Sequence, residues 1–149
     1  MKIQGRLGLL ILSFLILLFP LFTACHSEPV APQEPRILII NPPAESTITD
    51  NSITINTFVE RFELVSKVGQ GNSPGEGHII YYMDVAPPME QGQSTLTADG
   101  TCAISTEKSY TWDNIQPGSH VFWVQLVNND NTPLQPPEAV RVYVTVKQE

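Results

Sequence analysis

The chain has 149 residues, with 8 lysines and arginines against 15 aspartates and glutamates, and a formal net charge of −7. The first 24 residues contribute +2, so the remaining 125 carry 6 basic and 15 acidic side chains and a net charge of −9. This balance argues against nucleic acid as a partner and against electrostatic docking on anionic lipid, since both need clustered basic side chains. A length of about 125 residues suits one domain with a modest core.

Residues 1–24 have the pattern of a secretory signal peptide. Lys2 and Arg6 precede an apolar run from Leu7 to Phe19, and Pro20 and small residues follow that run. A basic start, an apolar stretch and small residues before a cleavage site are typical of such a signal. The alternative is an uncleaved transmembrane helix over about residues 7–24, a length at the short end of the 17–25 residues that a bilayer span needs.

The end of this segment, Leu21-Phe22-Thr23-Ala24-Cys25, resembles the lipobox of bacterial lipoproteins, in which Leu and two small residues precede a cysteine. Phe22 stands where that motif most often has Leu. The resemblance implies cleavage after Ala24 and attachment of a diacylglyceryl group to the Cys25 thiol, with acyl chains such as palmitate as the membrane anchor. It also implies an extracytoplasmic location, on the cell surface or the periplasmic face of the cell envelope.

Residues 25–36 carry three prolines among polar side chains, a composition typical of an extended linker. Residues 37–149 show the period-two alternation and the frequent turn residues of β-strands. No stretch has convincing helical periodicity, so the sequence predicts an all-β fold, a single immunoglobulin-like β-sandwich of about seven strands. A bend is expected near residues 60–61, where the apolar positions change parity. Strands are predicted over residues 36–40, 53–59, 78–85, 95–97, 102–104, 110–112, 120–127 and 140–146.

Two segments resemble known extracytoplasmic domains. Residues 109–130 (SYTWDNIQPGSHVFWVQLVNND), with the valine-rich last strand, resemble the final strands of immunoglobulin-like and fibronectin type III-like domains. Residues 77–84 (GHIIYYMD) resemble a Gly-His-x-His strand of uncharacterised prokaryotic secreted domains, with Ile80 in place of the second histidine. The resemblance implies the sandwich fold and no activity, because sandwich domains have many unrelated functions.

His78 and His120 are the two histidines of the predicted domain. Each begins a predicted strand, and those two strands are commonly neighbours in a seven-stranded sandwich. With Asp84, Asp113 or Cys102, the two imidazoles would suit copper or zinc, although no tight pair such as His-x-His is present. The alternative is structural, with His120 donating a hydrogen bond to the backbone at a corner and His78 capping a strand. No other cofactor is indicated.

Cys102 has no intramolecular partner if Cys25 is acylated, and it is expected to be a buried or half-buried strand residue. The alternative is a redox-sensitive or dimerising thiol. The oxygen-rich segment Asn128–Asn131 suggests calcium or a turn, and a turn is favoured because the acid spacing of a calcium loop is missing. No group of residues offers a nucleophile, a base and a charge stabiliser together, so the sequence predicts a protein that is not an enzyme.

The aromatic side chains of Tyr81, Trp123 and Tyr143 are predicted to share one sheet face if strand parity is assigned correctly. An exposed strip of this kind binds a protein or a glycan, whereas the alternative is packing in the core. The sequence therefore predicts a membrane-anchored lipoprotein whose sandwich is a non-catalytic binding or envelope-associated module. The alternative function is a copper- or zinc-binding domain that uses His78 and His120.

Overall fold

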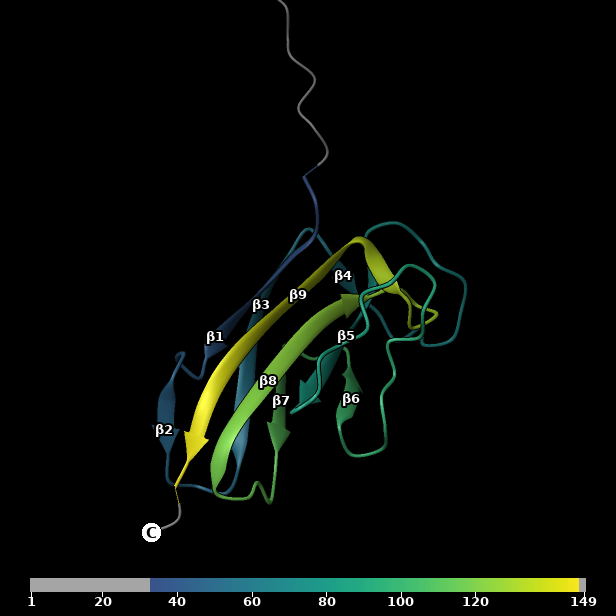
Figure 1. Ribbon diagram of the computed structural model, residues 1–149. Helices are drawn as coiled ribbons and strands as arrows, with labels where there is room; N and C mark the ends of the chain where they lie inside the picture. The colour runs from purple at the N-terminus through teal and green to yellow at the C-terminus, as the bar shows by residue number, and fades with distance from the viewer. Residues whose placement is uncertain (1–32, 148–149) are drawn as a thin grey trace, which may run out of the picture. The chain divides into compact units, whose positions relative to one another are not determined.

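A computed structural model describes residues 33–147, and Figure 1 shows how the strands of this range are arranged. The predicted signal segment and Cys25 lie outside the described residues. Within residues 33–147 no helix is long and apolar enough to cross a membrane. The described range contains nine strands: β1 (Arg36–Asn41), β2 (Ser46–Ile48), β3 (Ile53–Glu60), β4 (Glu63–Leu64), β5 (Glu76–Met83), β6 (Cys102–Ser105), β7 (Ser109–Trp112), β8 (Gly118–Val127) and β9 (Pro133–Val146).

The strands form two sheets. One has three strands in the order β1–β3–β7, and the other has six, in the order β2–β9–β8–β5–β4 with β6 also paired to β5. β2 runs parallel to β9 and β4 runs parallel to β5, while the other pairs are antiparallel. The long strands β8 and β9 lie side by side in Figure 1. Both sheets contribute side chains to a common core, so the predicted all-β sandwich is confirmed.

Alternation along the strands produces this core. In β3 the buried positions begin at Ile53 and recur at every second residue as far as Val59, while the residues between them face outward. β8 likewise buries alternate residues, namely Phe122, Val124 and Leu126. β9 buries the valines at its alternate positions. Burying a branched or aromatic side chain fully stabilises the fold by about 1.5–3 kcal/mol. The interface between the sheets is therefore the main source of stability.

β5 is buried on both faces. Its inward residues Ile79 and Tyr81 belong to the common core, whereas Ile80 and Tyr82 belong to a second, smaller apolar cluster on the outer face of the six-stranded sheet. The outer cluster is covered by the segment of residues 84–101, which links β5 to β6 and hydrogen-bonds to both β5 and β8. The central position predicted for this strand is confirmed.

The strands differ from the prediction in several places, and the short strand β4 is one of those that were not predicted. The bend after β3 is confirmed, with Arg61 at a φ of 54°, but residues 95–97 do not form a strand. β2 was not predicted, because three residues carry too short a pattern to recognise. β9 starts at Pro133 rather than near residue 140, since Val127 pairs with Pro133 beyond an irregularity in the register.

Candidate functional site

Two aromatic rings and an arginine lie together on the outer face of the six-stranded sheet. Trp123 of β8 is directly opposite Arg141 of β9, and Tyr143 follows two residues later on the same face. The Arg141 guanidinium carbon lies 4.9 Å from the centroid of the Trp123 ring and 5.3 Å from that of Tyr143. Such cation–π contacts are each worth about 0.5–1 kcal/mol at exposed sites, so they favour one orientation of the guanidinium. We call Trp123, Arg141 and Tyr143 the stacked surface.

The stacked surface is open to solvent. Tyr143 is 49% exposed and Arg141 is exposed, while Trp123 is half-buried against the outer apolar cluster. Within residues 33–147, Arg141 makes no side-chain hydrogen bond and no ion pair, so its N–H groups remain able to bind an acceptor. A preordered cation flanked by aromatic faces is an arrangement typical of binding hot spots.

The adjoining part of the same face is closed. The Tyr82 hydroxyl lies 2.9 Å from the Thr95 carbonyl and 2.8 Å from Oε1 of Gln125. The Gln125 amide in turn donates to the carbonyl of Pro88 at 3.0 Å and to Sδ of Met89 at 3.5 Å. Burial raises the pKa of Tyr82, with an opposing effect from the Thr95 hydrogen bond, so the phenol stays protonated. This hydrogen-bond network holds segment 84–101 against the sheet.

His78 belongs to this closed part. Its side chain is fully buried, and Nε2 lies 2.9 Å from Oδ1 of Asn131. Burial lowers the pKa of His78 more than the Asn131 hydrogen bond raises it, so the imidazole is neutral with Nε2–H as the donor. Nδ1 is buried and has no hydrogen-bond partner among the described residues. The neighbouring Gly77 is required by close packing, because a Cβ there would meet the Val127 carbonyl and the Phe62 ring.

His120 lies in a different setting. Nδ1 is 2.7 Å from Oδ2 of Asp84, and Nε2 is 2.7 Å from the Gln116 carbonyl. Both partners accept, so the geometry favours the doubly protonated ring. Burial alone would lower the pKa of His120, but the hydrogen bonds to Asp84 and Gln116 and the Asp84 charge outweigh burial and raise it. The hydrogen bond predicted from His120 to the backbone is present.

The structure does not bring the two histidines together. β5 and β8 are neighbours as expected, but they are antiparallel, and His78 lies opposite Val127 at the far end of β8 from His120. Seven residues of strand separate His120 from Val127, roughly 23 Å. The two rings also point to opposite faces. His78 has the parity of the outward Tyr82 in β5, whereas His120 has the parity of the inward Phe122 in β8 and packs near it. The predicted shared copper or zinc site is therefore wrong, and no three His, Cys, Asp or Glu side chains of residues 33–147 gather as metal ligands.

Tyr81 does not lie on the predicted aromatic strip. It is fully buried in the common core, stacks on Tyr110 at 5.4 Å between ring centroids, and donates from its hydroxyl to the Glu107 carbonyl. The outward tyrosine of β5 is Tyr82, which segment 84–101 covers. The predicted strip is thus wrong for Tyr81, while Trp123 and Tyr143 do share a face. Sequence reasoning missed Arg141, although it has the same parity as Tyr143 in β9.

The remaining candidates occupy structural positions. Cys102 is half-buried in β6 at the edge of the outer apolar cluster, with Sγ 3.9 Å from the Thr97 carbonyl. The predicted turn at Asn128–Asn131 is present, with the amide of Asn131 donating to the carbonyl of Asn128. Asn129 is fully buried there and donates to Oε1 of Glu76 at 2.9 Å.

Comparison with known proteins identifies no family for this chain. The chain matches no known protein family, and none of the curated proteins matches it. The PKD domain of human KIAA0319 is 19% identical over 82% of this chain and 88% of that one, with a TM-score of 0.39. An engineered protein is 12% identical over 78% of this chain, with a TM-score of 0.43. The chain covers 21% of that engineered protein.

Proposed function

We propose that this chain is a lipid-anchored extracytoplasmic lipoprotein whose sandwich domain is a non-catalytic binding module for a protein or glycan partner. The observation that carries the binding proposal is the stacked surface, where Arg141 lies exposed between two aromatic rings. Tryptophan, tyrosine and arginine are the residues most enriched at binding hot spots. Because the side chains of the stacked surface are held in place before a partner binds, the entropy cost of association is lower.

The chemistry of the stacked surface favours a partner with a flat or apolar face and an acidic group. The exposed ring of Tyr143 offers a stacking surface to a sugar ring or an apolar side chain. The Arg141 guanidinium has N–H groups suited to a carboxylate, to which arginine binds with two parallel hydrogen bonds. A non-catalytic function is supported by the separate engagement of His78, His120 and Cys102, each held by neighbours in a different part of the domain.

The binding proposal is tested by titrating the full chain, in detergent, against a glycan panel and solubilised envelope proteins. For any ligand that saturates, Tyr143→Ala and Arg141→Gln are each expected to weaken binding about tenfold or more, as hot-spot truncation does. Phe58→Ala is the matched control, because Phe58 is a similarly exposed aromatic, at 44%, on the outer face of the other sheet. Binding that survives Tyr143→Ala, or that is lost equally in Phe58→Ala, would contradict the proposal.

The anchor proposal rests on the lipobox resemblance at Cys25. In a bacterial host with lipoprotein processing, the wild-type chain is expected to incorporate labelled palmitate and to fractionate with membranes. Cys25→Ser removes the thiol that would be acylated, so it should take up no label and keep the mass of the unprocessed chain. An unlabelled wild-type protein that remains in the membrane at its unprocessed mass would favour the uncleaved helix. Label in Cys25→Ser would contradict acylation at Cys25.

A further inference from the structure

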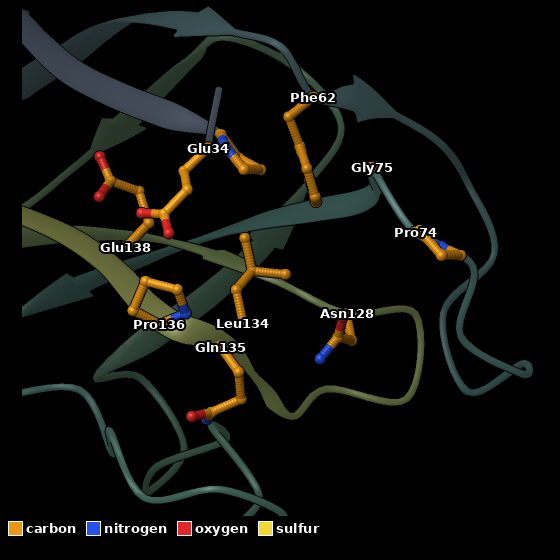
Figure 2. A pocket seen from close by; sticks show the side chains of 10 residues that line it. Glu34, Phe62, Pro74, Gly75, Asn128, Leu134, Gln135, Pro136 and Glu138 are labelled. Atoms are coloured by element: carbon orange, nitrogen blue, oxygen red, sulfur yellow. The ribbon is translucent and has the colours of Figure 1, made fainter. Parts of the chain in front are cut away.

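A pocket of about 250 Å³ lies at the end of the sandwich where β1 begins. Its walls come from five segments: the residues just before β1, the bend between β3 and β4, the loop before β5, the turn after β8 and the first part of β9. Figure 2 shows side chains from these segments around one hollow. The stacked surface contributes no residue to this pocket, so the two are separate sites.

The middle of the pocket is apolar. Phe62 and Leu134 point toward one another across it, with Pro136 beside Leu134 (Figure 2). Phe62 is held in place by close packing on Gly77, where a Cβ would lie 2.8 Å from the ring. These side chains offer a surface on which a short aliphatic chain loses water favourably.

One side of the pocket is acidic. Glu34 and Glu138 both line the pocket and are drawn on the same side of it in Figure 2, and the described residues that line the pocket include no lysine or arginine. Glu138 is fixed, because Oε1 accepts a hydrogen bond of 2.9 Å from the Ile37 amide. Its second carboxylate oxygen makes no hydrogen bond or ion pair with another residue of the range 33–147. Two carboxylates beside an apolar hollow attract a cation more strongly than they would in bulk water.

We propose that this pocket binds an ammonium group carried on a short aliphatic chain, the chemistry shared by a lysine side chain of a partner protein and a free alkylamine. The aliphatic chain lies between Phe62 and Leu134, and the ammonium group donates to Glu34 and Glu138. The volume is below the roughly 300–1,000 Å³ of pockets for drug-sized ligands, which fits one side chain and not a larger molecule. This site goes beyond the proposed function, since it neither uses nor requires the stacked surface.

The test is a titration of the methyl-labelled full chain in detergent micelles, observed by NMR at the Leu134 methyl groups. The probes are capped lysine (Nα-acetyl-lysine N-methylamide), its uncharged counterpart with norleucine, and butylamine. Saturating shifts at Leu134 are expected with at least one amine, and binding of the norleucine compound should be weaker by about tenfold or more. Tighter binding of capped lysine assigns the site to a partner's side chain, whereas tighter binding of butylamine assigns it to a free amine.

The variants separate charge from shape. Glu34→Gln combined with Glu138→Gln keeps the volume and the acceptor for the Ile37 amide, and it should weaken amine binding by about tenfold or more. Glu63→Gln removes an exposed carboxylate of β4 that does not line the pocket, and should leave binding unchanged. The proposal is overturned if no amine shifts Leu134, if norleucine binds as well as lysine, or if the double variant binds normally. Tyr143→Ala should not alter these shifts, so this site and the stacked surface fail independently.

Discussion

The outer face of the six-stranded sheet has two halves that differ in one respect. Over β5 and the adjoining part of β8, segment 84–101 covers the outward side chains, and Tyr82 and Gln125 are fully buried. Over β9 and the rest of β8, the outward side chains of Trp123, Arg141 and Tyr143 stay open, with Tyr143 49% exposed. Each half has an outward tyrosine, Tyr82 in the closed half and Tyr143 in the open half. The halves differ because segment 84–101 covers only the first of them.

The difference determines which outward side chains stabilise the fold and which stay exposed, as the proposed binding function requires. In the closed half the outward ring of Tyr82 is buried, and its hydroxyl hydrogen-bonds to Thr95 and Gln125. In the open half Arg141 contacts only the faces of the two rings, and its N–H groups are not used within the described range. Substitutions should therefore cost stability in the closed half and affinity in the open half.

The largest loss of stability is expected from removing a buried side chain of the closed half. Tyr82→Ala removes a fully buried ring together with its hydrogen bonds, and large-to-small changes of this kind cost about 3–5 kcal/mol. Urea unfolding followed by circular dichroism measures the loss. Tyr143→Ala is the control in the open half, where a surface substitution changes the free energy of unfolding by about 0.5 kcal/mol or less. Equal losses in the two variants would mean that the halves do not differ.

Lowering the pH should reduce the free energy of unfolding by a smaller amount, through protonation of His78 in the closed half. The folded state lowers the pKa of His78, so the unfolded chain binds more protons below its ordinary value of 6.5. Stability from this residue is therefore complete above pH 6.5 and is lost as pH falls from there toward the lowered pKa. Unfolding curves between pH 7.5 and about 5 should show a smaller decline in His78→Gln than in the wild type.

The pKa of His120 is shifted in the opposite direction from that of His78, so its effect on stability has the opposite pH dependence. Its pKa is raised in the folded state, so the stability it supplies is complete below pH 6.5 and is lost as pH rises through the raised pKa. His120→Gln should therefore steepen the decline toward acid pH, because it removes the contribution that opposes His78. A decline of the same size in the wild type and His78→Gln would show that the buried imidazole does not control it.

Alternation along single strands was the strongest signal in the sequence. It predicted β3, β8 and most of β9, because in these strands one face is buried and the other is mostly exposed or half-buried. The same signal failed in β5, where both faces are buried and the sequence cannot tell Tyr81 from Tyr82 as the inward residue. That ambiguity placed Tyr81 on the wrong face.

Relations between strands distant in the chain were beyond the sequence. His78 and His120 both lie near the start of their strands, and the antiparallel pairing alone puts them at opposite ends. Thr95 and Gln125 lie 13 and 43 residues after Tyr82, and no local pattern marks the three as one network. The pocket beside Glu138 is likewise assembled from five segments, so only the folded chain reveals it.

The division of this face is tested most directly by removing one hydroxyl from each half and measuring the free energy of unfolding. Tyr82→Phe removes the single O–H that the buried acceptors of Thr95 and Gln125 share, which should cost about 1–3 kcal/mol. Tyr143→Phe makes the same chemical change at an exposed ring and should cost no more than about 0.5 kcal/mol. We expect the loss in Tyr82→Phe to exceed that in Tyr143→Phe clearly. Equal values, or a larger loss in Tyr143→Phe, would contradict it.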